Sequence, residues 1–231
     1  MQQENRKQIA DFYDQYSDQQ KKIWVNIRHR SIMQRLQKNG LDTTSNVLEI
    51  GCGVGTLTSL LVKKAGKVLA IDISPTSIEL AKKNLCNRSN IQFLVSDMSD
   101  FTSTEKFDLI VLPDVLEHIP IEQHAALFAT LKRVLASHGK ICIHIPDPYA
   151  LEWIRKHTPE LMQIIDQSLY TDQLLDAIYP HQLTLHKLER YCLQKELPDY
   201  QWIELIHRPE YIDFNKKEYK KAVIDEIKSR L

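Results

Sequence analysis

The chain has 231 residues, of which 43% are hydrophobic and 26% charged, and its 30 Lys and Arg balance its 30 Asp and Glu. These proportions exclude an intrinsically disordered chain. The zero net charge argues against nucleic acid as the main partner, because phosphate binding needs an excess of cations. The polar opening and the lack of an apolar run near 18 residues predict no signal peptide, no membrane span and a cytoplasmic location. Four scattered cysteines without a CxxC pair predict reduced thiols.

Residues 1–45 show helical apolar spacing, and we interpret them as an N-terminal cap. From residue 46 onward, short apolar runs rich in β-branched residues alternate with helical patterns. This alternation predicts a doubly wound α/β core over 46–148, in which each parallel strand is covered on both faces. The expected strands are 46–50, 67–71, 91–95, 108–112 and 140–145, and the expected helices are 56–64, 75–84 and 121–137.

The rest of the chain is predicted to complete the sheet and to cover it. Residues 149–181 are predicted to form a helical insertion after the fifth strand, where a lid would border the ligand crevice of an open α/β sheet. Residues 182–231 are predicted to hold a helix at 183–194, a sixth strand at 200–207 and a terminal helix at 216–231. Only residues 211–214 offer a further strand before that last helix. Every Tyr and Trp lies outside 31–148, so the two ends of the chain supply the amphipathic aromatic residues suited to a pocket.

The first expected strand runs into a glycine turn, Glu49-Ile-Gly51-Cys-Gly53-Val-Gly55, although the chain has only 6 glycines. Backbone can approach a ligand closely at such a turn, and the following helix points its N–H groups at an anionic group. Asp72 ends the next strand, where a carboxylate can accept hydrogen bonds from two ribose hydroxyls. A dinucleotide site has the spacing GxGxxG, whereas this turn has GxGxG. Glu49, two residues before the first glycine, favours an ammonium group over a pyrophosphate. The sequence therefore predicts a cofactor that contains a nucleoside.

The glycine turn resembles motif I of class I S-adenosylmethionine-dependent methyltransferases. The resemblance continues in order over about residues 40–148, through VSDM at 95–98, FDLIVLPDVLEH at 107–118 and LKRVLASHGK at 131–140. It implies a Rossmann-like, mostly parallel seven-stranded sheet, with S-adenosylmethionine as cofactor and S-adenosylhomocysteine as product. Asp97 would hold the adenine amino group. The implied cofactor contacts are Glu49, Gly51, Cys52, Gly53, Gly55, Asp72, Ile73, Asp97, Met98 and Pro113.

The fourth motif indicates the acceptor class. Methyltransferases that act on the amino groups of nucleic-acid bases carry an (Asp/Asn/Ser)-Pro-Pro-(Tyr/Phe) sequence there, whereas this chain has Leu112-Pro-Asp-Val115. Leu116-Glu-His118 is similar to the branch with ubiquinone-biosynthesis, natural-product and sugar O-methyltransferases. We therefore expect methylation of a hydroxyl on a small molecule, with N-methylation of a small amine as the alternative. Two rival classes are a cofactor-binding protein without transferase activity and a nicotinamide-dependent oxidoreductase.

His118 is the preferred general base, because an imidazole titrates near working pH and this position follows the fourth strand. The alternative is that His118 caps a helix or hydrogen-bonds the cofactor. His144 and His181 are weaker candidates, and a metal site built from Asp114, Glu117 and His118 is disfavoured, so no metal is expected. Tyr16, beside Tyr13 on one helical face, is predicted to close over the cofactor and Arg28 to meet its carboxylate, against plain packing or solvent exposure. The candidates for lining the acceptor pocket are Tyr149, Trp153, Tyr170 and Tyr179.

Overall fold

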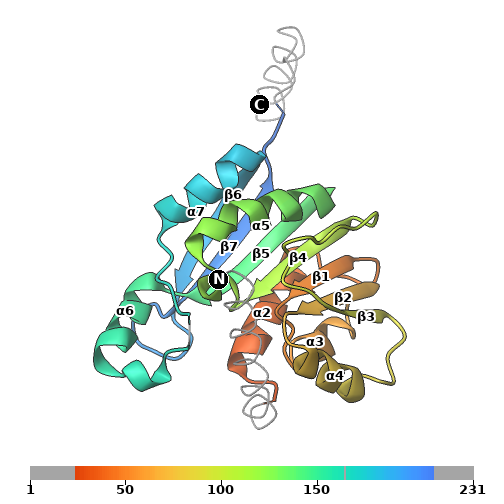
Figure 1. The fold of residues 1–231 in the computed structure, drawn as a ribbon, viewed down its shortest axis with the longest axis horizontal. Coiled ribbons are helices and arrows are strands. Elements are labelled where there is room, and N and C mark those ends of the chain that lie inside the picture. The colour runs from red at the N-terminus through yellow and green to blue at the C-terminus, as the bar shows by residue number, and fades with distance from the viewer. Residues whose placement is uncertain (1–23, 164, 211–231) are drawn as a thin grey trace, which may run out of the picture.

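A computed structural model describes residues 24–163 and 165–210 of the chain. These residues form a seven-stranded sheet in the order β3-β2-β1-β4-β5-β7-β6 (Figure 1). The first five strands are parallel, and β7 pairs antiparallel with both β5 and β6. The predicted doubly wound, mostly parallel Rossmann-like sheet is therefore confirmed. The strands are β1 (Asn46–Ile50), β2 (Lys67–Asp72), β3 (Ile91–Val95), β4 (Phe107–Pro113), β5 (Leu135–Pro146), β6 (Leu183–Tyr191) and β7 (Tyr200–His207).

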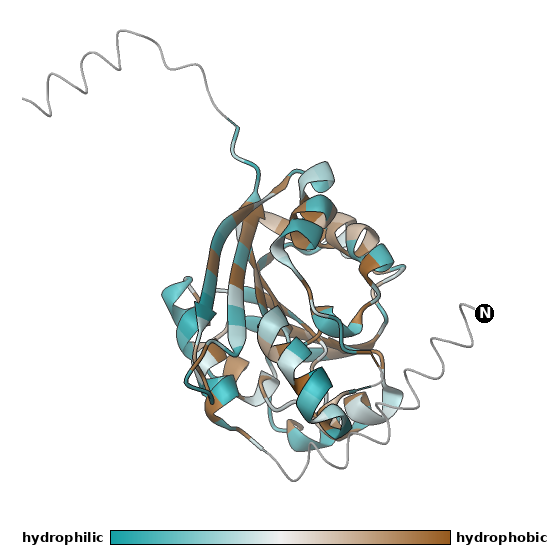
Figure 2. Cartoon of the chain, turned by 90° about the vertical axis from the view of Figure 1, so that its left-hand side faces the viewer, coloured by the Kyte–Doolittle hydropathy of each residue, from teal (hydrophilic) through white to brown (hydrophobic). Residues whose placement is uncertain are grey.

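Helices cover both faces of this sheet and enclose two apolar clusters. The cluster on one face joins the sheet to α5 and α7 through residues such as Phe128 and Ile178. The cluster on the other face joins it to α2, α3 and α4 through Leu36, Leu61 and Ile78. Figure 2 shows hydrophobic stretches along the strands and hydrophilic turns on the outer sides of helices. The helices are α2 (Ile27–Lys38), α3 (Thr58–Leu61), α4 (Pro75–Asn84), α5 (Ile121–Val134), α6 (Pro148–His157) and α7 (Thr171–Ile178), with short 3₁₀ helices at Leu116–His118, Pro159–Leu161 and Tyr179–His181.

Local sequence explains where the well-predicted helices begin. The Ser74 side chain accepts a hydrogen bond from Ser77 N at the start of α4, and Pro75 occupies the first helical position. The Asp147 side chain caps α6 in the same way by accepting from Tyr149 N. Both caps lie directly after the carboxyl end of a strand, β2 or β5. Each cap therefore fixes the direction in which the chain leaves the edge of the sheet that binds ligands in open α/β folds.

The prediction for residues 183–194 was wrong, because this segment begins with strand β6 and not with a helix. A register shift between Leu185 and Lys187 interrupts the pairing of β6 with β7. The extra residue displaces Leu188 from the alternation that Leu183 and Leu185 begin, so the apolar spacing no longer has the period of two typical of a strand. The strand predicted as the sixth, 200–207, is consequently the seventh. The segments predicted at 211–214 and 216–231 lie outside the described residues.

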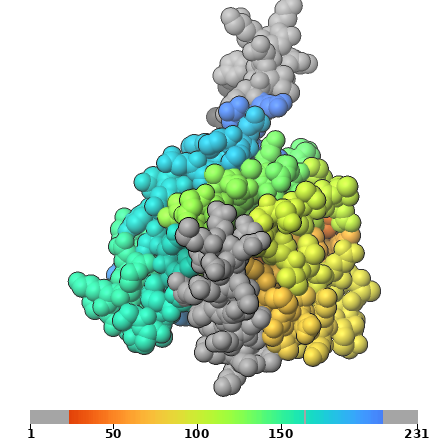
Figure 3. Space-filling model, viewed as in Figure 1, coloured from red at the N-terminus to blue at the C-terminus, as the bar shows by residue number. Residues whose placement is uncertain are grey.

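The predicted insertion at 149–181 holds helices, of which α7 packs on the core and α6 protrudes from it. Leu174, Ala177 and Ile178 of α7 are buried in the apolar cluster beneath α5. In contrast, α6 forms the protruding blue-green region at the lower left of Figure 3. No helix in the described ranges has both the length and the apolar character that crossing a bilayer requires. The use of this insertion as a substrate lid stays a prediction, and α7 serves as part of the layer that covers the sheet.

Candidate active site

The glycine turn after β1 has the backbone geometry that its sequence predicts. Gly51, Gly53 and Gly55 all have positive φ, of 75°, 53° and 85°. Gly51 N donates a hydrogen bond of 2.7 Å to Ile71 O, which ties the turn to the end of β2. A Cβ at Gly51 would lie 2.2 Å from Cγ2 of Val115 in the loop after β4. The turn therefore needs glycine both for its conformation and for close approach to a neighbouring loop.

Asp72 links this turn to the carboxyl end of β2. One of its carboxylate oxygens accepts from Gly53 N at 2.8 Å and the other accepts from Ser74 N at 2.9 Å. A carboxylate oxygen accepts more than one hydrogen bond, so ribose hydroxyls can bind to a carboxylate held in this way. Ile73, partly buried, follows directly. The structure thus brings the predicted ribose-binding acid to the glycine turn.

Glu49 lies beneath the turn with a fully buried carboxyl group. Its Oε2 accepts a hydrogen bond of 2.6 Å from the Thr58 hydroxyl, whereas its Oε1 has no hydrogen-bond partner among the described residues. Burial raises the pKa of Glu49 to about 8, with Asp72 adding to the rise and Thr58 opposing it. A buried carboxyl oxygen without a partner is costly unless a ligand satisfies it. An ammonium group would satisfy Glu49, so these residues fit the amino acid end of S-adenosylmethionine.

The ends of β3 and β4 carry the next predicted contacts. Asp97 is exposed after β3, and its Oδ1 accepts from the backbone and the hydroxyl of Ser99 at 3.0 and 2.7 Å. Met98 is buried and has a positive φ of 67°. Pro113 ends β4 and is partly buried. The two strands border the β2 and β1 ends on either side, so these residues share one edge of the sheet with the glycine turn.

His118 is enclosed by acidic and carbonyl groups. Its Nδ1 lies 3.0 Å from Asp166 Oδ1 and 2.5 Å from Ile165 O, and its Nε2 lies 3.8 Å from Glu117 Oε1. Burial alone would lower the pKa of His118, but Glu117, Asp166 and the Ile165 carbonyl raise it to about 9. A protonated imidazole cannot accept a proton from an acceptor molecule. These surroundings favour the alternative in which His118 makes hydrogen bonds without taking a proton, as a helix cap or a cofactor contact, while the base role itself stays a prediction.

Arg28, predicted to meet the cofactor's carboxylate, forms an ion pair with Asp114. Its Nε lies 3.1 Å from Asp114 Oδ2, and the charge of Asp114 raises the pKa of Arg28. Asp114 in turn binds the buried His144 at 2.7 Å, and His144 lies 2.7 Å from the Tyr191 hydroxyl. Tyr191 was not among the candidate residues, because the sequence pattern predicts a helix over 183–194. The alternation of Leu183 and Leu185 was a signal for the strand that carries it.

The aromatic residues predicted to line an acceptor pocket are largely exposed. Tyr149 and Trp153 of α6 are 60% and 50% exposed, and Tyr179 is 52% exposed. The Tyr170 hydroxyl donates to Glu152 at 2.6 Å in an exposed pair. His181, at the end of the 3₁₀ helix that follows α7, is partly buried. Tyr13 and Tyr16 lie outside the described residues, so the closing role predicted for Tyr16 stays a prediction.

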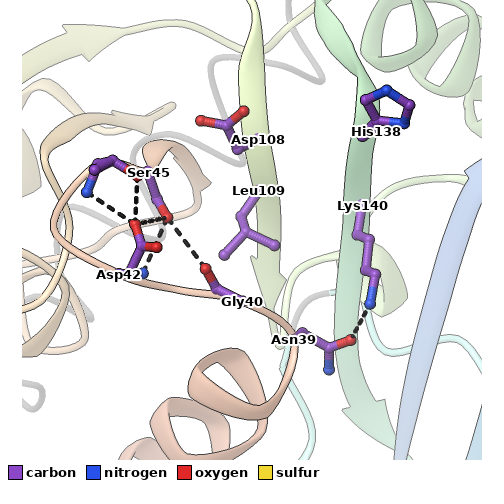
Figure 4. Close-up of a pocket in the computed structure, with 9 residues that line it drawn as sticks. Asn39, Gly40, Asp42, Ser45, Asp108, Leu109, His138 and Lys140 are labelled. Atoms are coloured by element: carbon purple, nitrogen blue, oxygen red, sulfur yellow. Dashed lines mark hydrogen bonds between the residues drawn. The ribbon is translucent and has the colours of Figure 1, made fainter.

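A cavity of about 300 Å³ opens at the other edge of the sheet. Figure 4 shows Asn39, Asp108 and Lys140 around it. Asn39 precedes β1, Asp108 lies near the amino end of β4, and Lys140 pairs with Leu109 of β4. Open α/β sheets bind their ligands at the carboxyl ends of the strands, so this cavity is separate from the candidate site. Among the residues that the structure describes, no group of three or more His, Cys, Asp or Glu is arranged to hold a metal ion.

The comparison with protein families identifies the core of the chain. Residues 47–139 match a family described as "Methyltransferase domain". This part of the chain is a methyltransferase domain. It contains β1 to β4, the glycine turn, Asp72 and His118, so the matched residues include most of the site described above.

Curated relatives are similar to about half of this chain but differ in what their names say they act on. Malonyl-[acyl-carrier protein] O-methyltransferase 1 of Ilyobacter polytropus is 31% identical over 57% of this chain and 47% of the relative. Trans-aconitate 2-methyltransferase of Escherichia coli is 28% identical over 63% of this chain and 55% of the relative. This chain thus spans about half the length of the curated relatives it matches.

Solved structures show the same fold around the methyltransferase domain. The N-methyltransferase NodS of Bradyrhizobium japonicum aligns with a TM-score of 0.62 and 23% identity, over 79% of this chain and 95% of that one. The magnesium protoporphyrin IX methyltransferase of Synechocystis with bound S-adenosylhomocysteine aligns with a TM-score of 0.66 and 16% identity, over 87% and 99%. At these identities the likeness concerns the fold alone.

Proposed function

We propose that this protein is an S-adenosylmethionine-dependent methyltransferase that methylates a hydroxyl group of a small molecule. The observation that carries the proposal is the buried Glu49 carboxyl with an unpartnered oxygen beneath a glycine turn whose other side is bound to Asp72. A ligand with both a cationic end and a ribose uses both acids. S-adenosylmethionine has these two parts, and when bound it supplies a methyl group already activated by a sulfonium.

The residues of the chain divide the work of binding and orientation. Glu49 binds the ammonium group, Asp72 the ribose hydroxyls and Asp97 the adenine amino group. Gly51, Gly53 and Gly55 let the backbone approach the ligand. Because the methyl group is already activated, the protein must chiefly hold the acceptor oxygen in line with it and remove a proton from a hydroxyl acceptor.

Other features bear on the class of acceptor and on the location of the protein. The chain as a whole has no excess of cations, which argues against nucleic acid as the acceptor. The free thiols of Cys52, Cys86, Cys142 and Cys192 fit a reducing cytoplasm. The second candidate is N-methylation of a small amine, which the likeness to NodS favours. A role as a cofactor-binding protein without transfer activity predicts tight binding with no acceptor that turns over.

The test is calorimetric titration with S-adenosylhomocysteine, followed by methylation assays with hydroxyl, amine and carboxylate acceptors. Asp72→Ala removes charged hydrogen bonds worth about 1.5–3 kcal/mol each, so we expect affinity to fall at least about tenfold. Asp172→Ala, an exposed change in the first turn of α7, is the matched control and is expected to bind like the wild type. A folded wild-type protein that does not bind S-adenosylhomocysteine would refute the proposal.

A further inference from the structure

A fully buried histidine on β5 lies between a carboxylate and a phenol. His144 Nδ1 lies 2.7 Å from Asp114 Oδ1, and His144 Nε2 lies 2.7 Å from the Tyr191 hydroxyl. An ionised carboxylate only accepts hydrogen bonds, so Nδ1 must carry the imidazole proton. In the neutral ring Nε2 is then the acceptor, and Tyr191 donates its hydroxyl proton to it. The three side chains thus form a directed chain of hydrogen bonds from Tyr191 through His144 to Asp114.

The backbone holds Asp114 where its carboxylate accepts the hydrogen bond from His144 Nδ1, and its surroundings keep that carboxylate ionised. Its φ of 55° is in the left-handed region, and its N–H donates to the His144 carbonyl oxygen at 2.7 Å. Burial would raise its pKa, but Arg28 and His144 hold the pKa of Asp114 at about 2. A carboxyl group that stays ionised stabilises a positive charge on His144 without taking its proton. Strain of this kind at a non-glycine residue is found at functional sites.

Of these three side chains, Tyr191 is the one that a ligand can reach. It is partly exposed, whereas the side chain of His144 has no exposed surface. The Ser31 hydroxyl donates to Tyr191 Oη at 3.3 Å, and the Arg35 guanidinium lies 3.9 Å from the centre of the Tyr191 ring. Burial raises the pKa of Tyr191, so the resting phenol keeps its proton and can donate it to His144.

His144 lies at the same edge of the sheet as the proposed cofactor contacts. His144 pairs with Pro113 across β4 and β5, at the carboxyl ends of both strands. The ring of Tyr200 stacks on His144 with 4.6 Å between ring centres, and Arg28 and His29 of α2 carry the other titratable groups that face the imidazole. The stacked Tyr200 ring and the pairing of β5 with β4 and β7 therefore fix the imidazole, and its two nitrogens bond to Asp114 and Tyr191.

We propose that Tyr191, His144 and Asp114 form the relay that removes the proton of the hydroxyl acceptor, an inference that rests on the proposed function. The acceptor hydroxyl gives its proton to Tyr191 Oη as Tyr191 gives its own to His144 Nε2. The acceptor oxygen forms its bond to the methyl carbon, and the bond between that carbon and sulfur breaks with its electron pair left on sulfur. The imidazolium formed on His144 is stabilised by Asp114 and returns its proton to solvent through Tyr191 after product release. Tyr191 is the catalytic residue, and His144 and Asp114 act through it.

The first measurement needs no acceptor. In ¹⁵N NMR spectra of the histidine-labelled protein, with His144 assigned by the His144→Gln variant, we expect a protonated Nδ1 and an unprotonated Nε2. Tyr191→Phe should shift the Nε2 resonance of His144, whereas Tyr170→Phe, which removes a hydroxyl from an exposed pair with Glu152, should not. A proton on Nε2 in the wild type would overturn the proposal, since Tyr191 then has no acceptor. This result does not depend on whether the protein is a methyltransferase.

The second measurement uses S-adenosylmethionine and a set of substituted phenols of graded acidity. General base catalysis contributes about 10²–10⁴-fold, so we expect Tyr191→Phe and His144→Gln to lower kcat by at least about 100-fold for weakly acidic phenols. The loss should shrink as the phenol becomes more acidic, and S-adenosylhomocysteine should bind as tightly as to the wild type. An equal loss for all phenols indicates a purely structural role and overturns the relay. A wild type that methylates amines or carboxylates but no hydroxyl, or that binds no S-adenosylhomocysteine, instead refutes the proposed function on which the relay rests.

Discussion

Replacing Gly51 with alanine separates two demands that the glycine turn places on its first residue. Gly51 has a φ of 75°, and a Cβ there would lie 2.2 Å from Val115 Cγ2. The left-handed conformation costs a residue with a Cβ about 1–2 kcal/mol. Forcing a methyl group into an occupied space costs a further 1–3 kcal/mol or so. Gly51→Ala should therefore lower the free energy of unfolding by about 2–5 kcal/mol.

Gly40 provides the matched control for this substitution. Its φ of 98° is also positive, but no atom lies within 4 Å of an added Cβ. Gly40→Ala should therefore show the conformational cost alone, about 1–2 kcal/mol. Val115→Ala removes Cγ2 and leaves Val115 Cβ at 3.5 Å, an ordinary contact, so combining it with Gly51→Ala should recover about 1–3 kcal/mol. Urea unfolding followed by circular dichroism measures all four proteins. Equal losses in the two alanine variants, or no recovery in the double variant, would refute the steric argument.

Two further predictions concern buried groups. The folded protein holds the pKa of Glu49 at about 8 through burial, whereas the ordinary value is 4.5, so the folded state keeps a proton that the unfolded state releases. As the pH rises between these two values, Glu49 should lower the free energy of unfolding by about 1.4 kcal/mol per pH unit. Urea unfolding at pH 5 and pH 8 should therefore show a smaller fall in the free energy of unfolding for Glu49→Gln than for the wild type. Trp202 is fully buried and donates to Glu204 at 2.8 Å, so Trp202→Ala should cost about 3–5 kcal/mol, measured by the same method. A loss below about 1 kcal/mol would contradict that packing.

The parallel half of the sheet was predictable because its signals are local. β1 and β3 have the predicted bounds, and α4 begins at the Ser-Pro pair that marked its start. The glycine turn and Asp72 are separated by one helix and one strand, so their spacing alone predicts that they meet. The structure confirms this meeting through the hydrogen bond from Gly53 N to Asp72.

The antiparallel half was less predictable because its pattern is interrupted and its contacts are distant. The register shift in β6 hides the alternation that would have placed Tyr191 in a strand.

The surroundings of His118 depend on Asp166, which lies 48 residues later, and no local pattern indicates that this carboxylate faces the imidazole. The acidity of a histidine is set by such partners, so its sequence position alone predicts reactivity poorly.

The hairpin of β6 and β7 lies apart from most of the residues proposed to bind the cofactor. Tyr191 and Tyr200 pair across β6 and β7, so a single hairpin positions both rings around His144. Asp199 closes this hairpin, since its carboxylate accepts from the N–H groups of Leu193 and Gln194 at 2.6 and 2.9 Å. None of these residues lies in the segment from Glu49 to Pro113, which carries the proposed cofactor contacts other than Tyr16 and Arg28. We therefore expect substitutions in the hairpin to alter acceptor specificity more than the binding of the methyl donor by Glu49 and Asp72.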